Sequence, residues 1–134
     1  MNSVGAILQE ADLNQWSYQK KFEALKNAGV VSQTVRFINA YDSVYEGSFG
    51  AWHEPVPAEY ISPQLSDHFS QEGVKTALVN RMGGKTSYNQ FLADIAASGV
   101  SHYKKEFISR DGSNSTYITY FNENEDQCYE QIVE

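Results

Sequence analysis

Two stretches of the chain, SYQKKFEALKNAGV at residues 17–30 and SYNQFLADIAASGV at residues 87–100, follow one pattern seventy positions apart. In each stretch a serine precedes apolar residues spaced i, i+4 and i+7, and a Gly-Val pair follows them. Ser17 and Ser87 stand where helix N-caps are expected, and the glycine stands where a left-handed residue ends a helix. The pattern therefore predicts two capped helices, each leading into an extended segment.

The repeat continues on both sides of these stretches. Upstream, apolar residues of similar spacing predict one more helix in each copy, near residues 4–11 and 74–81. Downstream, paired segments with strand character follow at VVSQTVRFI and VSHYKKEFI, then at DSVYEGSFGAW and SNSTYITYF. The second copy ends on QCYEQIV, which fits a third strand, whereas EPVPAEYISP in the first copy carries all three prolines and predicts a connector with at most an edge strand.

The predicted fold is α+β, with a helix-helix-strand-strand(-strand) unit that occurs twice because of an internal duplication. We expect one domain over residues 1–134, made of two related halves, 1–62 and 63–134. One such unit has a marginal core, but two units can share one. A mostly antiparallel sheet with the helices packed on one face satisfies this pattern.

The other face of that sheet is expected to be mixed, with apolar residues among charges. Alternation places Val35, Phe37, Tyr103 and Phe107 on the helix side. It leaves the following residues for the open side: Thr34, Arg36, Ile38, Lys104, Glu106, Ile108, Ile118 and Tyr120. An ordinary solvated face is one interpretation, and self-association as a homodimer is the other.

The amino-acid composition limits the kinds of molecule that the protein is expected to bind and the compartment in which it is expected to work. The net charge is −7, from 10 basic and 17 acidic side chains, which argues against a nucleic-acid binder because such proteins need a basic face. The single cysteine, Cys128, allows no internal disulfide and fits a reducing cytoplasm. No signal peptide and no apolar stretch long enough for a membrane span are recognisable, so we expect a soluble cytoplasmic protein.

Each motif that could indicate catalysis, metal binding or cofactor binding has a simpler structural interpretation. GGKTS at residues 83–87 resembles the end of a phosphate-binding loop, but Val79 replaces the earlier glycine and a helix precedes it. The three histidines are too widely spaced to predict a metal site. Cys128 stands in a predicted strand, without the surroundings of a nucleophile. The sequence therefore predicts no catalytic residue, metal or cofactor.

One weak candidate site remains at the connector after the first half. Trp52, His53 and Tyr60 bracket the proline-rich segment, and aromatic side chains with a histidine on a loop can line a pocket. In the alternative, Trp52 and Tyr60 only cover the edge of the core.

The doubled Y-x3-[FL]-x2-[LI]-x3-G-V helix end and the strands that follow resemble an uncharacterised family of bacterial and prophage proteins of about this length, often labelled phage envelope protein. The most specific part is EGVKTALVNRMGGKTSYNQFLADIAASGV at residues 72–100. The resemblance covers nearly the whole chain, but it supplies no catalytic or binding residues.

Three functional hypotheses follow. The first is a non-enzymatic, soluble, prophage-encoded protein that acts through protein–protein interaction as a homodimer. The alternative is a small-molecule-binding protein or small enzyme with a pocket near the 52–60 connector. The third is a structural component of a phage.

Overall fold

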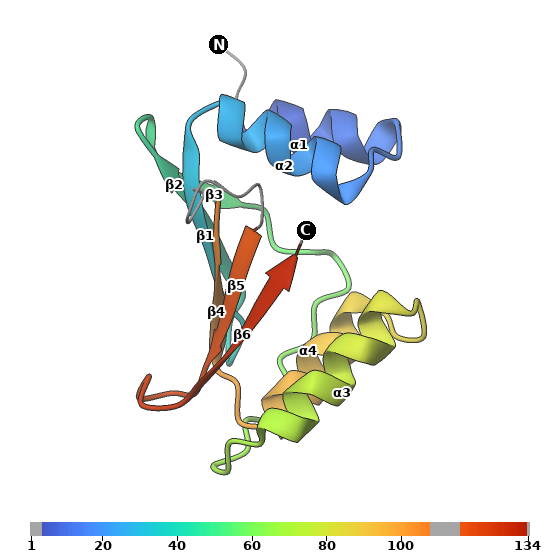
Figure 1. Ribbon diagram of the computed structural model, residues 1–134, viewed down its shortest axis with the longest axis vertical. Helices are drawn as coiled ribbons and strands as arrows, with labels where there is room; N and C mark the ends of the chain where they lie inside the picture. The colour runs from blue at the N-terminus through green and yellow to red at the C-terminus, as the bar shows by residue number, and fades with distance from the viewer. Residues whose placement is uncertain (1–3, 108–115, 134) are drawn as a thin grey trace.

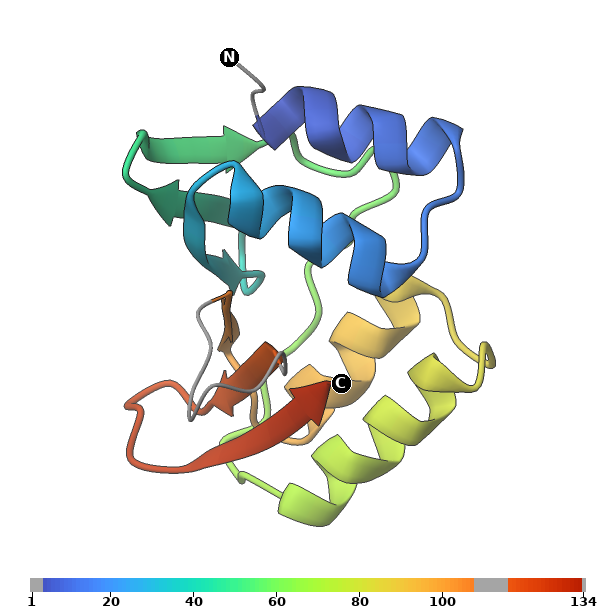
Figure 2. The same ribbon diagram turned by 45° about the horizontal axis from the view of Figure 1, so that its top comes forward.

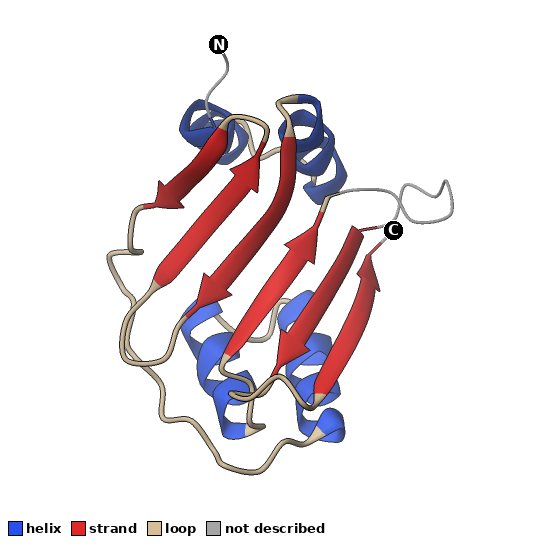
Figure 3. Ribbon diagram, turned by 90° about the vertical axis from the view of Figure 1, so that its left-hand side faces the viewer, coloured by secondary structure: helices blue, strands red, loops and turns tan. Residues whose placement is uncertain are grey.

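Four helices cover one face of a six-stranded antiparallel sheet in the computed structural model, which describes residues 4–107 and 116–133 (Figure 1). The elements in chain order are α1 (Val4–Leu13), α2 (Tyr18–Asn27), β1 (Val30–Arg36), β2 (Asp42–Gly47), β3 (Gly50–Glu54), α3 (Gln71–Met82), α4 (Tyr88–Ala97), β4 (His102–Glu106), β5 (Thr116–Phe121) and β6 (Cys128–Val133). Figure 3 shows the opposite face of the sheet without a helix over it. The predicted α+β class, with helices on one face, is confirmed.

The two halves meet at the centre of the sheet, whose strand order is β3-β2-β1-β4-β5-β6. The central strands β1 and β4 pair in antiparallel, with Thr34 opposite Lys104. These two residues are also related by the seventy-residue shift, so a pseudo-twofold axis through this pair exchanges the halves. The order of the elements thus repeats as the sequence predicts. The register does not repeat in the second strands, because Tyr45 pairs with Gln33 whereas Tyr117, its predicted counterpart, pairs with Glu106, and the internal duplication remains a prediction.

Helix ends form where the repeated stretches predict them. The hydroxyl oxygens of Ser17 and Ser87 accept hydrogen bonds from the backbone N–H groups of the third residue after each, and so cap α2 and α4. Gly29 and Gly99 follow the two helices with φ of 96° and 90°. That left-handed conformation is favourable for glycine and costly for other residues, so these glycines end both helices.

Figure 2 shows the helices as two separate pairs, α1 with α2 and α3 with α4. The core consists of two clusters, one beneath each pair. The larger lies between α3, α4 and the sheet, and includes the fully buried Val35, Leu92 and Ile95. The smaller lies beneath α1 and α2, and includes Leu25 and Phe107. Each helix pair therefore has its own apolar contact with the shared sheet.

The prediction for one strand was wrong. Ile118 and Tyr120, expected on the open face, are buried on the helix side. In the register of β4 with β5 they lie opposite Lys105 and Tyr103, and paired residues point to the same face of a sheet. Ile108, also expected on the open face, lies outside the described residues.

The third strand of the first half begins earlier than predicted. The segment 42–52, expected to be one strand, contains β2, a turn at residues 48–49 and the start of β3. Gly50, with φ of 107°, lets the chain reverse there. The three prolines then lie in irregular chain between β3 and α3, as the connector prediction requires. No helix in residues 4–107 or 116–133 is both long and apolar enough to cross a membrane.

Candidate functional site

The structure assigns Trp52 to the first half's core rather than to the connector. Its ring packs with Tyr45 at a centroid distance of 5.9 Å and lies directly against Gly5 of α1. It belongs to the smaller apolar cluster. These contacts are those of a residue that covers the edge of a core.

His53 and Tyr60 lie elsewhere, in different surroundings. The His53 side chain is exposed, with Nδ1 3.1 Å from a carboxylate oxygen of Asp42. Tyr60 packs against the larger cluster, and its hydroxyl donates a hydrogen bond of 2.5 Å to the carbonyl oxygen of Phe37. The residues proposed from sequence therefore have three separate environments, and the structure does not bring them together as one site.

A cavity of about 440 Å³ lies between the two helix pairs, over the second half of the sheet. It is lined by Gln19 of α2, Leu78, Arg81 and Met82 of α3, Tyr88 and Phe91 of α4, Tyr103 and Lys105 of β4, Ile118 and Tyr120 of β5, and Gln131 of β6. Small-molecule sites commonly occupy about 300–1,000 Å³, with mostly apolar walls and a few polar groups. This cavity has that size and composition.

Tyrosine hydroxyls form a chain that begins in the wall of this cavity. The hydroxyl oxygens of Tyr88 and Tyr103 lie 2.6 Å apart, and that of Tyr41 lies 3.1 Å from Tyr88. Burial raises the pKa of all three phenols, that of Tyr103 well above its ordinary value. They stay protonated at neutral pH and so keep their hydrogen-bonding capacity on the cavity side of the sheet.

Two basic side chains also face the cavity. Lys105 is half-buried, with Nζ 5.9 Å from the ring centroid of Phe22. Burial, with smaller contributions from the positive charges of Lys21 and Arg81, lowers the pKa of Lys105 to about 8, and Glu54 opposes the shift. Arg81 is exposed, and its guanidinium donates a 3.0 Å hydrogen bond to the carbonyl oxygen of Thr86. The site is therefore locally positive in a protein of net charge −7.

The sequence contained a signal for this site, in the repeat itself. In the alignment of the two halves by seventy residues, Lys105 corresponds to Val35, which is fully buried in the larger cluster. A charged residue at a position that is a core position in the other copy is unusual, because burying an amine is costly. Without the strand register, however, nothing connected Lys105 to Arg81 or to the tyrosines.

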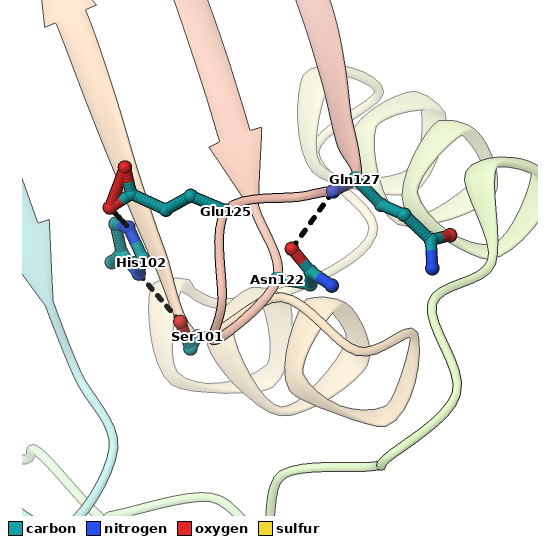
Figure 4. A network of polar contacts seen from close by, with 5 residues as sticks. All are labelled: Ser101, His102, Asn122, Glu125 and Gln127. Carbon is teal, nitrogen blue, oxygen red and sulfur yellow. Dashed lines mark hydrogen bonds and ion pairs between the residues drawn. The ribbon is translucent and has the colours of Figure 1, made fainter.

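A second polar network lies at the other end of β4 (Figure 4). His102 is buried, with Nδ1 2.5 Å from the Ser101 hydroxyl oxygen and Nε2 2.9 Å from a carboxylate oxygen of Glu125. Burial lowers the pKa of His102, so the ring is neutral. A neutral ring with its proton on Nε2 satisfies both contacts, since it donates to Glu125 and accepts from Ser101.

This network holds the turn between β5 and β6 against β4. Glu125 has a positive φ of 60°, and its backbone N–H donates to the carbonyl oxygen of Asn122. The Asn122 side chain accepts from the Gln127 N–H at 3.0 Å. A serine, a histidine and a carboxylate in line resemble a hydrolase triad, but here each bond has a structural role in a tight turn, so we interpret it as a structural network.

Within the described residues, no group of three or more histidine, cysteine, aspartate or glutamate side chains is placed to hold a metal ion. Cys128 is exposed in β6. A scan of the chain against models of known protein families found no match, and a search of curated proteins found none either.

Proposed function

We propose that this protein binds a small organic acid with an aromatic or apolar body in the cavity between the two helix pairs. The observation that carries the proposal is the positive, aromatic lining of this cavity in an acidic protein. Phe91, Tyr103 and Tyr120 offer faces and edges to an apolar body. Lys105 and Arg81 offer charge to a carboxylate or a similar anion.

Electrostatics favours an anionic ligand over a neutral one. The charges of Lys21 and Arg81 both disfavour protonation of Lys105. A bound anion near these groups offsets their mutual repulsion. An anionic ligand therefore gains binding free energy from electrostatic attraction as well as from the hydrophobic contact of its ring.

The test is a binding measurement with two probes that differ only in charge. We expect 4-(hydroxymethyl)benzoate to bind in isothermal titration calorimetry, and the neutral 4-(hydroxymethyl)benzamide to bind at least tenfold more weakly. Lys105→Gln and Arg81→Gln should each weaken benzoate binding about 10- to 100-fold, the range of one charge-assisted hydrogen bond.

The matched control is Lys104→Gln. Lys104 is adjacent in the chain, exposed, and points to the opposite face of the sheet. This variant should bind benzoate like the unaltered protein. Equal affinity for the two probes, or an equal loss in Lys104→Gln, would contradict the proposal.

Self-association through the open sheet face is the second candidate, and it retains the interaction role expected from the sequence. The observation in its favour is the apolar content of that face over β5 and β6, where Tyr117 and Phe121 are half-buried and Ile132 is 57% exposed. We expect light scattering to give the mass of a homodimer, and Ile132→Lys to shift it toward one chain. A single-chain mass at high micromolar concentration would exclude this candidate. A cytoplasmic location and a prophage origin remain proposals that rest on composition and on the family resemblance.

A further inference from the structure

The surroundings of Lys105 suit a reactive amine as well as an amine that binds an anion. It extends from β4 into the cavity beside Tyr103, which precedes it by two residues on the same face of the strand. Gln33 lies opposite it on β1, and the ring of Phe22 lies on its α2 side. Lys105 therefore stands in the wall of a space large enough for a small molecule, with aromatic rings beside it.

These surroundings increase the neutral fraction of the amine. With a pKa of about 8, about one Lys105 in ten is uncharged at pH 7, against roughly one in three thousand for an ordinary lysine. Only the uncharged amine is a nucleophile. Desolvation in an apolar pocket beside other cationic groups is a known way to activate lysine toward carbonyl compounds.

We propose that the ligand of this cavity is an aldehyde or ketone that carries an acid group, and that Lys105 captures it as an imine. This inference rests on the proposed function, because the same cavity must first bind the organic acid. Arg81 at the cavity would hold the acid group while the amine of Lys105 meets the carbonyl carbon.

The reaction balances without an oxidant or a metal. The Nζ lone pair forms a bond to the carbonyl carbon, and the carbonyl electron pair moves to oxygen, which takes up a proton. Nitrogen releases its first proton to give the neutral carbinolamine. The hydroxyl then takes up a second proton and leaves as water as the C–O bond breaks, and nitrogen releases its second proton as the C=N bond forms. Amine plus carbonyl thus gives imine plus water. The protonated phenols of Tyr88 and Tyr103 line the same cavity and are the available proton donors to oxygen.

The experiment traps the imine with 4-carboxybenzaldehyde and sodium cyanoborohydride, followed by peptide mapping by mass spectrometry. We expect the reduced adduct on Lys105 to exceed that on exposed Lys104 at least tenfold at pH 7. Lys105→Arg should lose this adduct, and Lys104→Arg should retain it. The α-amino group reacts in every variant, and mapping separates it from the lysines.

The pH dependence adds a second readout. Trapping at Lys105 should rise up to about pH 8 and then level off, whereas trapping of the free amino acid derivative Nα-acetyl-lysine should still rise above that. The charged groups that act on Lys105 are Lys21 of α2, Arg81 of α3 and Glu54 of β3, and the phenols of Tyr88 and Tyr103 in the same cavity stay protonated in this range. A Lys105 profile that matches Nα-acetyl-lysine would overturn the inference.

The two proposals can fail separately. The alcohol probe, 4-(hydroxymethyl)benzoate, differs from the aldehyde only in the oxidation level of one carbon and forms no imine. If it binds the unaltered protein and no preferential Lys105 adduct forms, the imine is excluded while the proposed binding function stands. If neither the alcohol binds nor the adduct forms, both proposals fail.

Discussion

The two halves of the molecule have the same order of elements but use one corresponding position in opposite ways. In β1, Val35 is fully buried and belongs to one cluster with Leu92 of α4. In β4, the corresponding residue is Lys105, and the residue that corresponds to Leu92 is Phe22, whose ring lies 5.9 Å from the amine. Each pair joins a strand of one half to a helix of the other, and the aliphatic pair Val35 and Leu92 thus corresponds to an amine and a ring, Lys105 and Phe22.

This difference shows how a symmetric fold can make an asymmetric site. The first half ends in a connector whose Tyr60 packs against Tyr41 at 5.2 Å and bonds to the Phe37 carbonyl. The second half ends in β6, whose Gln131 lines the cavity. The last segments of the two halves therefore differ, because one packs against the larger cluster and the other lines the cavity.

The largest expected effect is a loss of stability when the lysine of the second half is introduced at the corresponding position of the first half. Val35→Lys places a charge at a fully buried position, and we expect the free energy of unfolding to fall by about 3–5 kcal/mol. Urea denaturation followed by tryptophan fluorescence measures it. Val31→Lys, at a position 44% exposed in the same strand, is the control and should change stability by less than about 1 kcal/mol. Equal losses in the two variants would mean that burial does not distinguish Val35 from its neighbours.

The features that the sequence predicted well are local ones. The caps at Ser17 and Ser87 and the helix-ending glycines depend on a few neighbouring residues, so short patterns determine them. The order of helices and strands could be predicted because the pattern occurs twice. The paired halves then implied a shared sheet.

The next prediction compares the glycines that end α2 and α4. A Cβ at Gly29 would approach only the flexible Ser48 hydroxyl, at 2.9 Å, whereas at Gly99 it would lie 2.5 Å from the backbone oxygen of His68. We expect Gly29→Ala to cost about 1–2 kcal/mol from the positive φ alone, and Gly99→Ala about 3 kcal/mol because the backbone must also move. Thermal and urea unfolding of the pair measure the difference. Equal costs would show that the connector beside Gly99 yields as easily as a side chain.

The features that the sequence did not predict depend on contacts between distant segments. Ile118 and Tyr120 were placed on the wrong face because their side follows from the pairing of β5 with β4, and strand pairing is not encoded in either strand alone. The cavity was missed for the same reason. Its walls come from six elements, and only the tertiary arrangement brings Arg81, Lys105 and the tyrosines to one place. The predicted connector site rests on aromatic residues and a histidine that are close in sequence, which does not make them close in space.

The smallest expected effect concerns the network at His102, which belongs to the second half. Burial lowers the pKa of His102 below its usual 6.5, with Arg36 contributing in the same direction and Glu125 opposing it. The folded state therefore prefers the neutral ring. At pH 7.5 and above the ring is largely neutral in both states and adds little pH dependence. As the pH falls below 6.5, the unfolded chain takes up a proton that the folded chain does not, so stability falls by at most about 1.4 kcal/mol per pH unit.

Urea unfolding of the unaltered protein and of His102→Gln between pH 7.5 and 5.5 tests this sign. The variant is expected to be less stable at pH 7.5, because it loses the contacts with Ser101 and Glu125. Its stability should nevertheless change less on acidification, so the two curves should approach each other as the pH falls. If they instead separate, the folded protein gains from a charged ring, and the ion pair with Glu125 outweighs burial. In that case the turn between β5 and β6 would be held by charge rather than by a neutral hydrogen-bonded ring.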